Sequence, residues 1–345
     1  MANQTNPLDA NATRSRILFR LGALISLLLF ALAAAIALGG PTKPKPMQSI
    51  SDPFKDVDFS GLAPLSHYAA RDGAKLAYRR YMPPSNVAVR GSVVLVHGSS
   101  ANSQSLHPLA QSFAQAGYSA YALDIRGHGD SGKRGAIAYI GQLDDDMEDF
   151  MQSLRPAGPT TLVGFSAGGG FAIGIAGGPR QTMFDNYLFM APFTSRHAAN
   201  YRPNAGGWVS VGIPRIVGLT FLNRIGLTAF NGLPVVDFAI DDAIAGRAPQ
   251  AQLTPAYSFA LSKNFQPPED YQATIRNIHR PATVMDGQDD EVFIADKFSQ
   301  VFADAGRPDI PISLVPGAGH ITLTLMPAAR ATAVAIVEKM ALAPR

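Results

Sequence analysis

The sequence predicts an α/β domain with a mostly parallel central sheet, helices on both faces of that sheet, and one transmembrane helix before it. Three observations carry this prediction. Apolar strand-like segments alternate with helical patterns, several of the strands are uncharged throughout, and an uncharged run of 18 residues lies near the N-terminus. The 345 residues are 47% hydrophobic and 16% charged, which excludes a disordered chain.

Composition also excludes several kinds of protein. The absence of cysteine rules out a disulfide scaffold, a thiolate nucleophile and cysteine-ligated metal sites. The net charge of +3, with no long run of lysine or arginine, argues against a nucleic-acid partner. The acidic run at residues 144–149 is interpreted as the solvated face of an amphipathic helix, so neither a metal nor a cofactor is expected.

The segment Leu21–Leu38 is long and apolar enough to cross a bilayer. As a helix it would span about 27 Å, close to the thickness of the hydrocarbon core. Arginines at positions 14, 16 and 20 precede it, which predicts a cytoplasmic N-terminus and a domain outside the cytoplasm, in the periplasm or extracellular space. Because Ala35-Ile36-Ala37 resembles a signal-cleavage site, a secreted protein is the alternative.

These features divide the chain into three parts. Residues 1–40 form a cytoplasmic tail with the membrane anchor, or a signal peptide. Residues 41–50 contain three prolines and two lysines, which predicts an extended linker. Residues 51–345 form the folded domain.

The elements of this domain follow from their hydrophobic patterns. The first two strands flank the turn Arg71-Asp72-Gly73 and alternate polar with apolar residues, as in a half-exposed antiparallel pair. The later strands are continuous apolar runs. We expect strands at residues 66–70, 75–81, 92–97, 118–124, 160–165, 187–191, 282–285 and 312–315, and helices at 103–116, 140–154, 167–176 and 326–341.

A candidate nucleophile lies between the strand at 160–165 and the helix that follows it. The segment Gly164-Phe165-Ser166-Ala167-Gly168 matches G-x-S-x-G in the strand–turn–helix setting that the motif requires. The turn from strand to helix is sharp and holds Ser166 in a strained conformation. Side chains at Gly164 or Gly168 would collide in such a turn. The serine hydroxyl then lies at a helix N-terminus, which favours developing negative charge.

A nucleophilic serine needs a base, and His320 is the candidate. It ends the segment Gly317-Ala318-Gly319-His320, between the last strand and the last helix, and would face Ser166 at the carboxyl edge of the sheet. By contrast, His97 ends a buried strand and is interpreted as a structural residue whose hydrogen bonds are satisfied.

The acid that orients the base is expected between Ser166 and His320 in the chain. Residues 286–291 offer four carboxylates. Asp286 is expected at the end of its strand and Glu291 at the start of the next helix. Asp289 and Asp290 remain, and spacing alone does not choose between them.

Two backbone amides are expected to stabilise the oxyanion. One belongs to Ala167, the residue after the nucleophile, and the other to Ser99 on the loop after the strand at 92–97. Gly98 permits this loop to approach the site closely.

Together these motifs resemble the α/β-hydrolases, and among them the monoacylglycerol lipase and lysophospholipase group, which is also grouped with serine aminopeptidase-like hydrolases. The resemblance covers about residues 65–341 and is carried, in the family's order, by His97–Ser99, Asp124–Ser131, Gly164–Gly168, Gly287–Val292 and Gly317–His320. It implies the α/β-hydrolase fold, with Asp124–Ser131 as a structural loop. The short HGSS loop departs from lipase-like relatives, which often carry an acidic or aromatic residue after the glycine.

The resemblance also selects the acid. The family's G-x-x-D-x-V pattern aligns Gly287 with Val292 and implies that Asp290 is the acid, with Asp289 as the fallback.

An insertion of about 90 residues separates the strands at 187–191 and 282–285, far more than a usual connection. By resemblance, residues 194–278 form a cap over the site. From Ala205 to Val236 only Arg215 and Arg224 are charged. This pattern fits a small helical cap with its own core, or an exposed apolar lid that lines an acyl pocket or touches the bilayer.

The resulting hypothesis is a serine hydrolase that cleaves carboxylic esters through an acyl-enzyme. A nearby membrane anchor favours lipid-like esters, such as monoacylglycerols or lysophospholipids. The alternatives are another acyl hydrolase such as a thioesterase, a non-catalytic binding protein, or an aminopeptidase-type enzyme. A peptidase would need acidic cap residues to hold an amine, for which the sequence offers Asp241, Asp242, Glu269 and Asp270. The sequence does not predict the oligomeric state.

Overall fold

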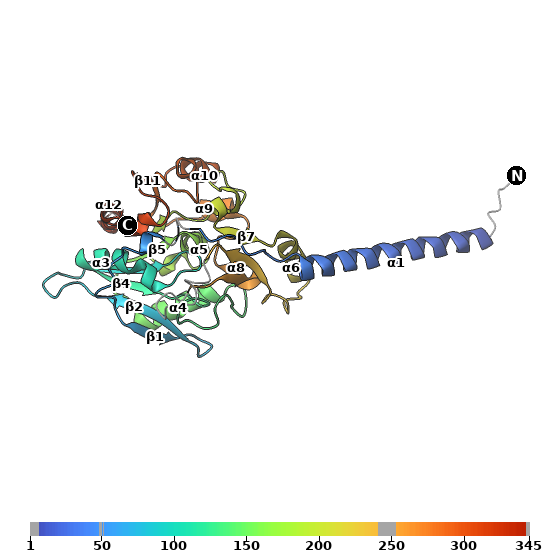
Figure 1. The fold of residues 1–345 in the computed structure, drawn as a ribbon, viewed down its shortest axis with the longest axis horizontal. Helices are drawn as coiled ribbons and strands as arrows, with labels where there is room; N and C mark the ends of the chain where they lie inside the picture. Colours follow the sequence, from blue (N-terminus) through green and yellow to red (C-terminus); the bar gives the residue numbers. More distant parts are fainter. Residues whose placement is uncertain (1–6, 48–49, 51, 241–252, 343–345) are drawn as a thin grey trace.

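The computed structural model describes residues 7–47, 50, 52–240 and 253–342, and its centre is an eight-stranded sheet in the order β1-β2-β4-β3-β5-β6-β10-β11 (Figure 1). The antiparallel pairs are β1 with β2 and β2 with β4, while every other neighbouring pair is parallel. The strands are β1 (Leu65–Ala69), β2 (Lys75–Tyr81), β3 (Gly91–Val96), β4 (Tyr118–Leu123), β5 (Thr160–Phe165), β6 (Asn186–Met190), β10 (Ala282–Gly287) and β11 (Ile312–Val315). The expected mostly parallel sheet is confirmed.

Helices cover both faces of the sheet (Figure 1). One face carries α3 (His107–Gln115), α11 (Thr322–Leu325) and α12 (Pro327–Leu342), which contact one another. The other carries α4 (Gln142–Leu154), α5 (Ala167–Ala176), α9 (Tyr271–Arg276) and α10 (Phe298–Asp304). Because β3 to β6 are enclosed by these layers, every one of their residues is buried.

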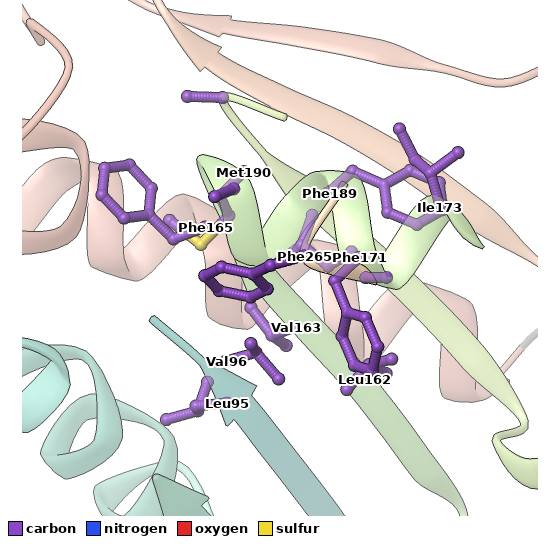
Figure 2. Packing of buried hydrophobic residues seen from close by; sticks show 14 of the residues in the cluster. Leu95, Val96, Leu162, Val163, Phe165, Phe171, Ile173, Phe189, Met190 and Phe265 are labelled. Carbon is purple, nitrogen blue, oxygen red and sulfur yellow. The ribbon is translucent and has the colours of Figure 1, made fainter. Parts of the chain in front are cut away.

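Buried apolar side chains surround the point where β5 leads into α5 (Figure 2). Figure 2 shows Val96 of β3 and Leu162 of β5 near Phe171 of α5, with Phe265 of the insertion beside them. All four side chains are buried. The segment that carries Ser166 is therefore held in well-packed surroundings.

The insertion after β6 contains a small sheet that the sequence did not predict. Its antiparallel strands are β7 (Val209–Val211), β8 (Pro234–Phe238) and β9 (Ala256–Ser258), and the helices around them include α6 (Ile213–Arg224) and α8 (Phe259–Asn264). The insertion thus contains strands as well as helices, which differs from the helical cap that was one of the two alternatives. Strands of three to five residues are too short to show a clear period-2 pattern.

The acidic run on α4 is not the solvated face that we expected. Asp146 is 5% exposed and pairs with Arg126 at 2.7 Å, and Asp149 is 9% exposed and pairs with Arg71 at 2.9 Å. The carboxylates of α4 thus hold together the β1–β2 turn and the loop after β4. This role depends on arginines that are distant in sequence, so periodicity did not reveal it.

The N-terminal helix α1 (Pro7–Leu38) projects from the domain (Figure 1), and an 18-residue window within Arg14–Leu38 has a mean hydropathy of 2.7 and contains no buried residue. It is long and apolar enough to span a membrane, as a signal sequence can also be. Its last turns pack against α6, where Ile36 lies over Gly218. The Arg215 guanidinium donates hydrogen bonds to the carbonyls of Ile36 and Ala37 at 2.7 and 2.9 Å, and so caps the helix C-terminus.

The following segment continues along the insertion. The Thr42 amide donates to Ser210 Oγ at 3.1 Å, and the Met47 amide donates to the Ala239 carbonyl at 3.0 Å. The segment at 41–47 therefore contacts β7 and the end of β8.

Candidate active site

Ser166 lies in the turn from β5 to α5, with φ 55° and ψ −117°. This left-handed conformation is unusual for a residue with a side chain. Three backbone hydrogen bonds hold it: the Ser166 amide donates to Met190 at 2.9 Å, and the amides of Gly170 and Phe193 donate to the Ser166 carbonyl at 3.0 and 2.9 Å. The strained turn is thus fixed from both sides.

The steric argument for the flanking glycines is confirmed. A Cβ at Gly164 would collide with the Gly168 carbonyl oxygen. A Cβ at Gly168 would collide with the carbonyl oxygens of Val96 and His97 at the end of β3. Only glycine lets the turn close against the neighbouring strand.

Ser166, His320 and Asp290 form a hydrogen-bonded series. His320 Nε2 lies 3.0 Å from Ser166 Oγ, and His320 Nδ1 lies 2.6 Å from Asp290 Oδ2. A carboxylate can only accept, so Nδ1 carries the proton and Nε2 presents a lone pair to the serine hydroxyl. The imidazole packs between Phe165 and Phe293 and is 2% exposed.

The structure distinguishes between the two acid candidates. Asp290 is buried and bonds to His320, while Asp289 is exposed. The other Asp290 oxygen, Oδ1, accepts from the amides of Val292 and Phe293 at 2.6 and 2.7 Å. Burial raises the pKa of Asp290, but His320 and these hydrogen bonds outweigh that effect and hold the pKa below its usual value.

The remaining two carboxylates also lie beside the series. Asp286 is fully buried at the end of β10, as expected, and burial together with the Asp290 charge raises the pKa of Asp286 to about 10, so it is neutral. The expectation that Glu291 opens a helix is wrong, because α10 begins only at Phe298. Instead, Glu291 Oε2 accepts the His320 amide at 3.0 Å and anchors the loop that carries the base.

A cavity of about 240 Å³ opens in front of Ser166. Its wall includes Ser99 and Ala167, the two residues whose amides were expected to face an oxyanion, and neither amide has a backbone acceptor among the described residues. Most of the remaining wall is contributed by the insertion and is largely apolar, and Val292 and Phe293 after β10 complete it. The residues from the insertion include Trp208, Val209, Val211, Ile216, Val236, Phe238, Tyr257, Phe259 and Phe265.

The family model described as "Serine aminopeptidase, S33" (Hydrolase_4) matches residues 87–324, more than half of the chain and every residue of this site. The chain belongs to this family. S33 members are α/β-hydrolases, so the resemblance drawn from the motifs is confirmed.

Curated relatives of this S33 member include two kinds of enzyme. A monoacylglycerol lipase from Mycolicibacterium smegmatis is 36% identical over 115 residues, which are 31% of this chain and 40% of the lipase. This alignment therefore covers less than half of that lipase. A putative protein-lysine deacylase, ABHD14B, from Pongo abelii is 31% identical over 167 residues, 47% of this chain and 75% of that protein.

Solved structures share the fold. A soluble variant of monoglyceride lipase from Saccharomyces cerevisiae, in complex with a substrate analogue, has a TM-score of 0.63 at 19% identity and covers 83% of this chain and 97% of its own. The monoacylglycerol lipase of Paleococcus ferrophilus has a TM-score of 0.53 at 21% identity, with 77% and 98% covered. The α/β-hydrolase fold predicted from the sequence is thus confirmed.

Of the acidic residues considered for amine binding that the structure of this S33 member describes, Glu269 lines the cavity and Asp270 does not. Glu269 lines the wall together with the cationic side chains of Arg196 and Lys263, whereas Asp270 caps α9 by accepting from Ala273. Asp241 and Asp242 lie outside the described residues. Within the described ranges, no three His, Asp or Glu side chains are grouped to hold a metal ion.

The sequence did not reveal two side-chain contacts to the oxyanion loop, by which we mean Gly98–Ser100 after β3. His97 Nδ1 donates to the Gly98 carbonyl at 2.8 Å, but its Nε2 is buried with no partner among the described residues, so the expectation of a fully satisfied histidine is wrong. The Tyr257 hydroxyl of β9 accepts a hydrogen bond from the Ser100 amide of the same loop at 2.7 Å, although Tyr257 lies more than 150 residues further along the chain. No local pattern in the sequence signals that contact.

Proposed function

We propose that this chain is a serine hydrolase that cleaves carboxylic esters through an acyl-enzyme. The observation that carries the proposal is the pair of hydrogen bonds that join Ser166, His320 and Asp290, at 3.0 and 2.6 Å. A serine hydroxyl gains nucleophilicity when an adjacent imidazole accepts its proton, and a buried carboxylate stabilises the imidazolium that forms.

In the proposed reaction, Ser166 Oγ attacks the ester carbonyl carbon while its proton passes to His320 Nε2. The carbonyl oxygen becomes an oxyanion, which the Ser99 and Ala167 amides stabilise. The C–O bond of the ester then breaks, and His320 returns the proton to the departing alcohol. Water attacks the acyl-enzyme by the same route and releases the carboxylic acid and free Ser166.

The lining of the cavity favours a substrate whose acyl group is apolar. Its wall is largely apolar, which suits a hydrocarbon chain, and among the described residues it carries two cationic side chains, Arg196 and Lys263, and one carboxylate, Glu269. An ammonium group of a peptide N-terminus would meet two like charges there. We therefore propose lipid-like esters, such as monoacylglycerols or lysophospholipids, rather than peptides.

This proposal predicts a preference for long acyl chains. With the full-length protein in detergent, we expect kcat/KM for p-nitrophenyl decanoate to exceed that for the acetate by about tenfold or more, because buried methylenes contribute to binding. A panel of monoacylglycerols, lysophospholipids, acyl thioesters and aminoacyl anilides tests the head group. Fast acetate hydrolysis without long-chain hydrolysis would contradict the lipid proposal, and aminoacyl cleavage alone would support a peptidase.

We also propose that α1 is retained as a membrane anchor and that the hydrolase domain lies outside the cytoplasm. Cleavage after Ala37 would remove the carbonyls that Arg215 caps and the turn that packs on Gly218. Near this junction the insertion exposes apolar side chains that suit the bilayer interface. Each of them is at least half exposed: Val217, Phe221, Ile225, Leu227 and Phe230.

The topology can be tested with single cysteines, because the natural chain has none. We expect Ser299→Cys, on the exposed side of α10, to react with a membrane-impermeant maleimide in intact cells or spheroplasts. The matched Ser15→Cys, before the apolar run, should react only after lysis. Intact mass should include residues 1–37; the opposite labelling pattern, or a chain that begins at residue 38, would contradict the proposal.

A further inference from the structure

Three consecutive peptide units of the oxyanion loop are held by side chains or backbone groups outside it. His97 Nδ1 donates to the Gly98 carbonyl at 2.8 Å, the Ser100 amide donates to Tyr257 Oη at 2.7 Å, and the Thr254 amide donates to the Ser100 carbonyl at 2.8 Å. Ser100 is buried and has φ +68°, a strained value for serine. Such a conformation persists only where its surroundings fix it.

These restraints determine where the Ser99 amide points. In a trans peptide, the Gly98 carbonyl and the Ser99 N–H point in opposite directions. His97 holds the carbonyl on one side, so the N–H is directed to the other. The next peptide unit is fixed by Tyr257, which prevents the loop from turning about Ser99.

The Tyr257 hydroxyl is itself oriented by a buried histidine. His128 Nδ1 lies 3.4 Å from the Arg126 carbonyl, which can only accept, so Nδ1 carries the proton. Burial and the nearby His97 hold the pKa of His128 well below its usual value, so the ring is neutral. His128 Nε2 therefore accepts the Tyr257 O–H at 2.6 Å, which leaves the phenol oxygen free to accept from Ser100.

We propose that Tyr257 is a positioning residue by which the insertion sets the oxyanion donor of Ser99. The inference rests on the proposed function, because it assigns a role within the same reaction. Tyr257 and Thr254 belong to the segment of the insertion that leads into β9, and the Ser258 amide fixes that segment to the Gly135 carbonyl at 2.7 Å. The Ser99 amide is therefore correctly oriented only when this part of the insertion packs against the core.

The test compares Tyr257→Phe with Tyr187→Phe in the full-length protein. Both changes remove one buried phenol hydroxyl that bonds to the backbone, but Tyr187 lies on β6 and donates to the Gln181 carbonyl, outside the described site. We expect Tyr257→Phe to lower kcat for the best ester about 10- to 100-fold with KM nearly unchanged, because a misplaced donor weakens only transition-state binding. Tyr187→Phe should keep the wild-type kcat.

The inhibition constant Ki of a trifluoromethyl ketone provides a measurement that does not depend on the stability of the fold. The adduct of this ketone with a serine carries an oxyanion, so the Ki should rise for Tyr257→Phe by about the factor by which kcat/KM falls. If Tyr257→Phe does not fold, His128→Leu keeps the phenol but removes its acceptor. It should lower kcat more than His128→Gln, whose amide oxygen can replace that acceptor.

The outcomes separate the two proposals. A wild-type chain that neither hydrolyses esters nor reacts with a fluorophosphonate would overturn the proposed function and this inference with it. An active wild type with an unchanged kcat and Ki in Tyr257→Phe would overturn this inference alone. An equal loss in Tyr187→Phe would also overturn it, because the effect would then be one of stability.

Discussion

Replacing Ser166 by alanine is expected to lower kcat for ester hydrolysis by about a millionfold and to abolish labelling by a fluorophosphonate probe. The hydroxyl at 3.0 Å from His320 Nε2 is the atom that would form the acyl bond. Without it, the imidazole has no nucleophile to activate, and only the oxyanion donors and substrate binding remain. Burst kinetics and gel-based labelling of the full-length protein measure both effects.

Ser299→Ala is a matched control, because it removes an exposed hydroxyl on α10 that does not line the cavity. It should keep wild-type labelling and turnover. Ser166→Ala should also keep its thermal unfolding temperature, since the Ser166 backbone and not its hydroxyl holds the turn. If Ser166→Ala retained fluorophosphonate labelling, another residue would be the nucleophile.

The strands of the central sheet could be predicted because most of them are short apolar stretches that can be recognised without their neighbours in the fold. The apolar runs at β5 and β11 and the small-residue helix α5 have the bounds that the pattern predicted. Every residue of β5 is buried, as expected for a continuous apolar run in a parallel sheet, whereas β11 lies at the edge of the sheet and buries only Val315. The glycines at 164 and 168 were equally predictable, because a sharp strand-to-helix turn leaves no room for a Cβ.

The features that escaped prediction depend on long-range contacts. Asp289 and Asp290 are neighbours, and only the fold decides that one is exposed and the other faces His320. Two carboxylates of α4, Asp146 and Asp149, are buried beside arginines that come from other segments of the chain. Tyr257 reaches the oxyanion loop across more than 150 residues, so no periodicity or motif marks it.

Replacing Asp290 by asparagine is expected to lower kcat by about 10⁴-fold with KM nearly unchanged. The amides of Val292 and Phe293 donate to Oδ1, so they hold the asparagine oxygen at that place. Its NH₂ group must then face His320 Nδ1, which can no longer donate a proton there. The tautomer inverts, Nε2 carries the proton toward Ser166, and the imidazole cannot act as a base.

Asp289→Asn is the matched control, because it makes the same chemical change one residue earlier on an exposed side chain. It should retain nearly wild-type kcat, whereas Asp290→Asn should still bind substrate, since Asp290 is absent from the cavity wall. Ester kinetics and fluorophosphonate labelling rates of both variants show which of the two aspartates is the acid. An equal loss in the two variants, or a loss confined to Asp289→Asn, would contradict Asp290 as the acid, because Asp290 and not Asp289 bonds to the His320 ring.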